Sequence, residues 1–173
     1  MLGIFPIAAL VGVAVAKRKT TERHRNPLPF FDSPERVLDE LARRCMIDSY
    51  GLITRQFTNR SRTTWTEIVD ILVGHYRQQY AIPLIRELWV GQHLNASIRS
   101  LDQIWCDEIA VLVFEQFEIH APRFNRLSHL QCAIAVEIIE RLAQYAFRTN
   151  PSGDETVLAE SHDVLREYLS SFE

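Results

Sequence analysis

The chain has 173 residues, of which 47% are hydrophobic and 24% charged, and its net charge is −3. This length and hydrophobic content suit one domain with a buried core, or one domain and a short arm, and exclude a disordered chain. Only 6 glycines and 7 prolines interrupt long stretches rich in Leu, Ile, Ala, Glu and Arg, which excludes a strand-and-turn protein. An all-α fold is therefore predicted.

Charge is unevenly distributed along the chain. Residues 1–31 hold five basic residues and one acidic residue, a net charge of +4, so the remaining residues carry −7. Because an acidic body repels phosphate, we expect any contact with DNA to be made by this arm. A solvated basic tail is the alternative. The residues expected to contact DNA are Lys17, Arg18, Lys19, Arg23 and Arg25.

The cysteines and the apolar N-terminal segment are the sequence features that indicate where in the cell the protein is located. Cys45, Cys106 and Cys132 lie far apart and form no C-x-x-C pair, which favours reduced thiols and a cytoplasmic protein. Residues 1–16 are uncharged and apolar, but they fall short of the roughly 20 residues that span a bilayer and lack a preceding positive segment. We expect no membrane association. A small membrane-tethered protein anchored by residues 1–16 stays as an alternative.

Capping residues mark the first helix starts. Ser33 is placed as an N-cap before Pro34, which favours a long helix from there to about Phe57. Thr64 and Glu67 have the spacing of a capping box, which predicts that the next helix opens there.

Further signals predict a short helix and then a long one. Pro83 begins the short helix, which is expected to end near Asn95. Ser97 or Ser100 caps the long helix, and Pro122 stops it.

The predicted helix over residues 127–148 is apolar around most of its circumference. Leu130, Ile134, Ile138, Leu142 and Tyr145 form one stripe, and a second stripe runs beside it. A helix of this kind must be buried on two sides, so we expect a homodimer through it and the last helix. A single chain that buries both faces is the alternative. The predicted dimer interface comprises Cys132, Val136, Ile139, Ala143, Phe147, Val157, Val164, Leu165 and Tyr168.

No sequence motif indicates catalysis. The chain has no G-x-S-x-G, P-loop or G-x-G-x-x-G, and its six histidines form no metal-binding spacing. Asp102 and Cys106 share a helix face, but such pairs are common on exposed helices. We therefore predict that the protein is not an enzyme and that it binds no metal or cofactor.

Aromatic residues on the central helices indicate a different kind of site. Cavities between helices that are lined by aromatic rings bind small hydrophobic molecules, with a few polar groups that fix the orientation. His75, Gln92 and His93 could supply such groups, although the rings could simply fill the core. The predicted ligand-binding residues are Trp65, Ile68, Leu72, Tyr76, Trp89, His93, Trp105, Ile109 and Phe117.

Several segments resemble the ligand-binding half of the TetR (tetracycline repressor) family of transcription regulators. They are FFDSPERVLDEL, PLIRELWVGQHLNASIRSLDQIWCDEIA, SHLQCAIAVEIIERLAQYAFR and, after a break at residues 150–153, DETVLAESHDVLREYLSSF. The resemblance implies an all-α ligand-binding and dimerisation domain over residues 32–173, which dimerises through its last two helices. It also implies that a small apolar ligand controls DNA binding.

Upstream, IAALVGVAVAKRK from Ile7 resembles the family's turn into its recognition helix, with Gly12 at the turn. Residues 1–31 are therefore identified as a basic and apolar arm that holds a partial helix-turn-helix remnant. The alternative function is a sensor or dimerisation module without sequence-specific DNA binding of its own.

Overall fold

The computed structural model describes residues 33–58, 60, 63–90 and 96–173. The chain divides into two compact units, Met1–Glu40 and Leu41–Glu173. Of the first unit, only residues 33–40 are described, and they form the start of the first helix. The residues predicted to contact DNA (Lys17, Arg18, Lys19, Arg23 and Arg25) therefore lie outside the described residues, as do His93 and the apolar segment 1–16.

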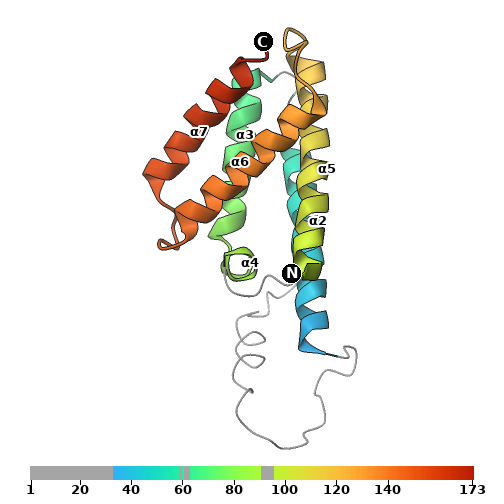
Figure 1. Ribbon diagram of the computed structural model, residues 1–173, viewed down its shortest axis with the longest axis vertical. Helices are drawn as coiled ribbons and strands as arrows, with labels where there is room; N and C mark the ends of the chain where they lie inside the picture. The colour runs from blue at the N-terminus through green and yellow to red at the C-terminus, as the bar shows by residue number, and fades with distance from the viewer. Residues whose placement is uncertain (1–32, 59, 61–62, 91–95) are drawn as a thin grey trace, which may run out of the picture. The chain divides into compact units, whose positions relative to one another are not determined.

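The described part of the chain is helical and contains no strand, which confirms the predicted all-α class. Within it, no helix combines the length and the apolarity that crossing a bilayer requires. The helices are α2 (Pro34–Thr58), α3 (Trp65–Ala81), α4 (Pro83–Trp89), α5 (Ala96–His120), α6 (His129–Phe147) and α7 (Glu155–Ser170) (Figure 1).

Local capping explains where these helices start. The Ser33 hydroxyl accepts a hydrogen bond from the Arg36 backbone N–H at 3.3 Å, as expected of an N-cap. Thr64 and Glu67 form both hydrogen bonds of the predicted capping box at the start of α3. Ser128 caps α6 in the same way, through Gln131.

Two predicted boundaries need correction. Helix α4 ends at Trp89 rather than near Asn95, and the Val90 backbone N–H closes its last turn on the Arg86 carbonyl at 2.8 Å. Helix α5 starts at Ala96, ahead of both predicted caps. Ser100 does not cap it, because its hydroxyl instead donates to the Ala96 carbonyl one turn back, at 3.0 Å.

Helix α6 lies at the centre of the Leu41–Glu173 unit. It packs against α5, α7 and α3, and Figure 1 shows it between α5 and α7 with α3 behind. Its inward side chains fill the core, which corrects the choice of dimer-interface residues made from the sequence. Because these side chains are at most 2% exposed in the single chain, they cannot also meet a second copy. They are Cys132, Val136, Ile139, Ala143 and Phe147, together with Leu165 of α7.

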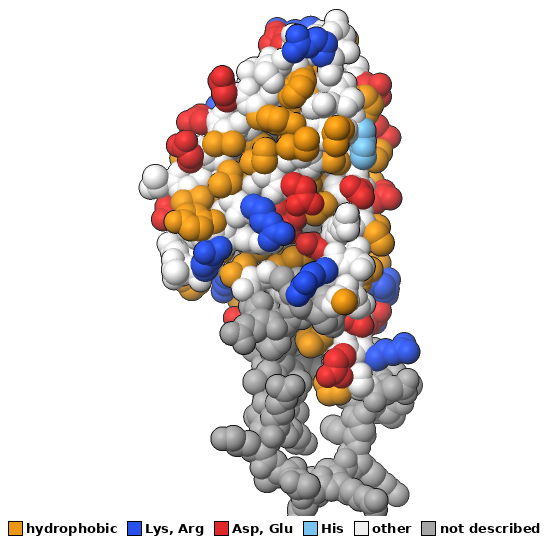
Figure 2. All heavy atoms as spheres, viewed as in Figure 1, with side chains coloured by type: hydrophobic (Ala, Val, Ile, Leu, Met, Phe, Trp, Pro, Cys, Tyr) orange, Lys and Arg blue, Asp and Glu red, His pale blue; other side chains and the backbone are white. Residues whose placement is uncertain are grey.

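The first apolar stripe of α6 faces outward. Leu130 is 61% exposed, Ile134 40% and Tyr145 57%, whereas the inward stripe is inaccessible. The remaining predicted interface residues, Val157, Val164 and Tyr168 on α7, are half-buried. Figure 2 shows hydrophobic side chains gathered over α6 and α7 on the face that the view presents. Helix α6 therefore has two apolar faces, one that packs in the core and one that points outward.

A tight turn at Gly153 joins α6 to α7. Gly153 has a φ of 83°, and its backbone N–H donates to the Asn150 carbonyl at 2.9 Å. A Cβ at this position would lie 2.8 Å from Cζ of Phe147, whose ring is buried. Both the backbone angle and the packing therefore require glycine.

We expect Gly153→Ala to lower the free energy of unfolding by about 1–3 kcal/mol, because it combines a strained φ with a clash in the core. Gly74→Ala is the matched control, since Gly74 lies inside α3 and a Cβ there meets nothing within 4 Å. The control should gain about 0.5–1 kcal/mol. Urea unfolding followed by circular dichroism measures both, and equal effects would contradict this account of the turn.

Candidate ligand cavity

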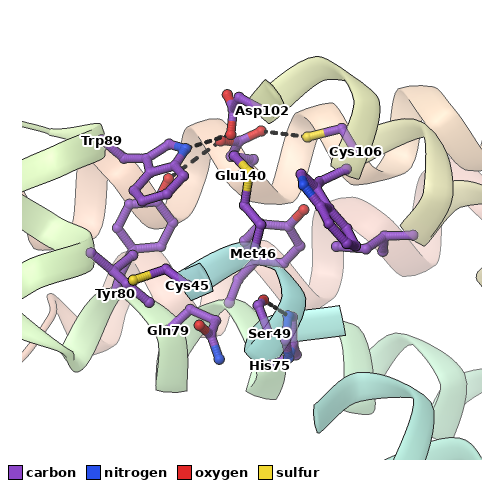
Figure 3. A pocket seen from close by; sticks show the side chains of 14 residues that line it. Cys45, Met46, Ser49, His75, Gln79, Tyr80, Trp89, Asp102, Cys106 and Glu140 are labelled. Carbon is purple, nitrogen blue, oxygen red and sulfur yellow. Dashed lines mark hydrogen bonds between the residues drawn. The ribbon is translucent and has the colours of Figure 1, made fainter. Parts of the chain in front are cut away.

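A cavity of about 60 Å³ lies within the Leu41–Glu173 unit, among α2, α3, α4, α5 and α6 (Figure 3). Five helices contribute to its wall, so its shape depends on how they pack together. The lining residues are Cys45, Met46, Ser49, His75, Tyr76, Gln79, Tyr80, Ile85, Trp89, Asp102, Trp105, Cys106, Ile109 and Glu140.

Four of the residues predicted to bind ligand meet in this cavity: Tyr76, Trp89, Trp105 and Ile109. They come from α3, α4 and α5. The Trp105 ring also packs on Tyr50 of α2, with ring centroids 5.5 Å apart. The structure therefore brings these four predicted residues together in the wall of one cavity, and ligand binding by them stays a prediction.

Other predicted ligand residues do not line this cavity, although Phe117 lines a second pocket beside the end of α5. Trp65 and Phe117 both pack on Phe124, with ring centroids 5.3 and 5.1 Å from it. Ile68 and Leu72 are at most 1% exposed and belong to the core. Helical spacing alone could not separate these rings and branched chains from the cavity wall, because core residues and cavity-lining residues follow the same period.

The polar part of the wall is built around Glu140 of α6, which is 4% exposed. Its Oε1 accepts hydrogen bonds from the Tyr80 hydroxyl at 3.4 Å and from the Gln144 side-chain amide at 3.2 Å. The Cys106 thiol donates to Oε2 at 3.0 Å. The indole N–H of Trp89 donates to Oδ1 of Asp102. Figure 3 shows Asp102, Cys106 and Glu140 side by side.

Glu140 is buried and Asp102 half-buried, and neither carboxyl group forms a salt bridge within the described residues. Burial, reinforced by repulsion from Asp102, raises the pKa of Glu140 to about 7. Burial also raises the pKa of Asp102. The thiol pKa of Cys106 is raised by burial and by the adjacent Glu140, so the sulfur keeps its proton and is a poor nucleophile.

His75 occupies another part of the wall and is 1% exposed. Its Nε2 forms a hydrogen bond with the Ser49 hydroxyl at 2.9 Å, whereas its Nδ1 has no partner among the described residues. Burial lowers the pKa of His75 to about 4, so the ring is neutral at physiological pH. Buried polar atoms in proteins are usually hydrogen-bonded, so this nitrogen is an exception.

The sequence carried partial signals for the residues that the prediction missed. Glu140 is a single acidic residue within the inward apolar stripe of α6, between Val136 and Ala143, and a buried acid in such a stripe indicates a polar site. Asp102 and Cys106 were recognised as sharing a face, but nothing in the sequence showed that Glu140 meets them. The contribution of α2 had no local signal, because its cavity residues lie on an ordinary amphipathic helix.

Comparison of the chain with protein-family models, with curated proteins and with solved structures finds no match. The arrangement of the described residues is therefore the basis for assigning a role. It combines an apolar wall, one buried and one half-buried carboxyl group, a thiol and a neutral imidazole in a small cavity.

The raised pKa of Glu140 predicts a specific pH dependence of stability. An unfolded glutamate loses its proton near pH 4.5, whereas Glu140 in the folded chain keeps it to about pH 7. Between these values the folded state binds more protons, so the free energy of unfolding falls as pH rises. His75 acts in the opposite direction between about pH 4 and pH 6.5, because its lowered pKa stabilises the folded chain as pH rises.

Glu140→Gln isolates the glutamate contribution. We compare the free energy of unfolding of this variant with that of the unsubstituted chain. The difference between them should change by on the order of 2 kcal/mol in favour of the variant as the pH rises from about 5 to about 8. Glu137→Gln, the same change at an exposed position of α6, should show no comparable gain. Urea unfolding across this range provides the measurement. Parallel profiles for the two variants would mean that Glu140 ionises as an ordinary glutamate.

Proposed function

We propose that this protein is a dimeric, ligand-sensing transcription regulator of the TetR type. The observation that supports this most directly is the cavity, because residues of five helices line it and one of them, His75, has a buried nitrogen without a partner among the described residues. Such a cavity can couple the binding of a small molecule to the packing of several helices. The resemblance of the sequence segments supports the same role.

The sequence predicts a small apolar ligand. The cavity wall favours a small ligand that also has a polar or charged group. Trp89, Trp105 and Ile109 offer apolar contacts, whereas Asp102 and Glu140 offer acceptors or a shared negative charge. A volume of about 60 Å³ favours a small occupant. We therefore propose a small ligand with a group that donates hydrogen bonds or carries positive charge.

Helix α2 is the proposed route from the cavity to the DNA-binding segment. Cys45, Met46 and Ser49 of α2 line the cavity, and the same helix begins at Pro34, directly after the basic arm. A ligand that prefers one position of α2 would shift the equilibrium between positions of that helix. In this proposal the basic residues of the arm contact DNA, and the helix changes how the two arms of a dimer are spaced.

The proposed dimer uses the outward side of α6 and α7 rather than the inward residues. Leu130, Ile134 and Tyr145 expose apolar surface on α6, and α7 adds half-buried Val157 and Tyr168. Two copies meeting through this surface would bury it in a symmetric interface of four helices. Homodimerisation is consistent with the apolar patch in Figure 2.

Two further parts of the proposal concern catalysis and location. We propose a non-enzymatic protein, since burial and the adjacent Glu140 raise the pKa of the Cys106 thiol, which makes the sulfur a poor nucleophile. The three cysteines are free thiols, which supports a reducing, cytoplasmic setting.

Ile134→Glu tests the dimer. Placing a charge on the outward face of α6 should convert the dimer to a monomer, with a dissociation constant raised at least about a hundredfold. Ile104→Glu is the matched control, because Ile104 is a 56% exposed isoleucine on α5 and should leave the dimer intact. Light scattering coupled to size-exclusion chromatography measures the mass. A monomeric unsubstituted chain would contradict the proposal.

DNA recognition is tested by selecting bound duplexes from a random pool with the full chain. The regulator proposal predicts an enriched inverted repeat, with half-sites about one helical turn apart. Replacing Lys17, Arg18 and Lys19 by Ala should weaken binding at least about tenfold and reduce its dependence on salt. Weak, salt-sensitive binding without an enriched sequence would instead identify a sensor module that lacks its own DNA specificity.

A further inference from the structure

Three side chains of the cavity wall, those of Asp102, Cys106 and Glu140, are of the types that bind metal ions. One ligand atom from each of Asp102, Cys106 and Glu140 lies within 4.8 Å of the other two. Cys106 and Glu140 are 7% and 4% exposed, and Asp102 is half-buried, so this is not the exposed acidic surface common on soluble proteins. The three residues come from two helices, α5 and α6.

The distances suit a tetrahedral metal ion. With Zn–O bonds of about 2.1 Å and Zn–S bonds of about 2.3 Å, neighbouring ligand atoms lie roughly 3.4–3.7 Å apart. The sulfur of Cys106 lies 3.0 Å from Oε2 of Glu140, so small side-chain shifts would open the spacing that an ion requires. A thiolate with two carboxylates favours zinc, cobalt or iron(II) over magnesium or calcium, which prefer sites built from oxygen ligands alone.

Donors from outside the set orient both carboxyl groups. Trp89 holds Oδ1 of Asp102, while Tyr80 and Gln144 hold Oε1 of Glu140. This leaves the Glu140 oxygen that faces Cys106 available for an ion. Such supporting hydrogen bonds fix the direction of metal ligands in many sites.

His75 adds a buried polar side chain to the same cavity wall. Nδ1 of His75 is buried and has no partner among the described residues, in a cavity of about 60 Å³. This volume holds several water molecules. A three-ligand site needs such space, since water or a small molecule completes the coordination, and hydrogen-bonded solvent in the cavity would give His75 its missing partner.

We propose that Asp102, Cys106 and Glu140 bind a divalent transition-metal ion of the zinc type, and that this ion is the signal, or part of the signal, that the cavity senses. On binding, the Cys106 thiol releases its proton to solvent and its sulfur bonds the ion. A carboxyl group that carries a proton releases it as well. Affinity therefore rises with pH. The sensing part of this inference rests on the proposed regulator function, whereas the binding part does not.

Cobalt(II) tests the site directly, because thiolate coordination produces a charge-transfer band in the near ultraviolet. The full chain, freed of metal with a chelator, is titrated with Co²⁺ and then with Zn²⁺ as competitor. We expect one Co²⁺ per chain, a thiolate band that Zn²⁺ removes, and tighter binding as pH rises. Cys106→Ser should abolish the band, and Glu140→Gln and Asp102→Asn should each weaken Zn²⁺ binding at least about tenfold.

Matched controls separate ligation from damage to the fold. Cys132→Ser makes the same change at a buried thiol outside the cavity lining, and Glu160→Gln makes the same change at an exposed position of α7. Both should leave the band and the affinity unchanged. Circular dichroism shows which variants fold, and Asp102→Asn, at the least buried of the three ligands, provides a test if the Cys106 variant fails to fold.

Three results would overturn the metal site. They are the absence of Co²⁺ and Zn²⁺ binding by the folded full chain, a band that persists in Cys106→Ser, and a band lost in Cys45→Ser instead. Stabilisation by butylammonium without metal binding would also overturn it, and would reassign the carboxyl groups to an organic cation. Because absorbance reports binding without DNA, a metal site that leaves DNA affinity unchanged would contradict only the sensing role.

Discussion

Two carboxyl groups, those of half-buried Asp102 and buried Glu140, lie near one another without a salt bridge from any described residue, and the surrounding structure compensates for them. Removing a carboxylate from water costs several kcal/mol unless it is protonated, hydrogen-bonded or neutralised. The chain supplies the first two remedies, because burial raises the pKa of both groups and Trp89, Tyr80 and Gln144 donate to them. The third remedy, a positive charge, would have to come from an occupant of the cavity.

These donors also explain why several helices meet at this point. Trp89 is on α4 and Tyr80 on α3, so hydrogen bonds join these two helices to the carboxyl groups on α5 and α6, and Gln144 adds a donor from α6 itself. Apolar packing alone does not fix such a location, because branched side chains tolerate small shifts of register. A hydrogen-bonded polar cluster is less tolerant, since each lost partner leaves a buried group unsatisfied. Its residues therefore define the site more sharply than the rings do.

Much of the fold follows from local rules that a sequence displays. The caps at Ser33 and Thr64 were readable because capping acts over three residues, and the end of α6 was readable from the break at 150–153. The residues of the cavity were harder to predict from the sequence. Tyr76 and Trp105 share their periodicity with Ile68 and Leu72, so spacing could not tell which side chains face a void. The meeting of Glu140 with Asp102 and Cys106 is a tertiary fact, which no local pattern encodes.

The same limit explains the error over the dimer face, and its correction links the two proposals. Both stripes of α6 are apolar, so the sequence could not decide which one the chain itself covers. In the structure, the inward side of α6 presents Glu140 to the cavity while its outward side presents Ile134 and Tyr145. One rigid helix thus carries a ligand of the proposed metal site and the centre of the proposed dimer interface. An ion that widens the 3.0 Å spacing between Glu140 and Cys106 would shift α6 relative to α5, and any such shift changes the surface that a second copy meets. If both proposals hold, binding in the cavity and the geometry of the dimer cannot vary independently.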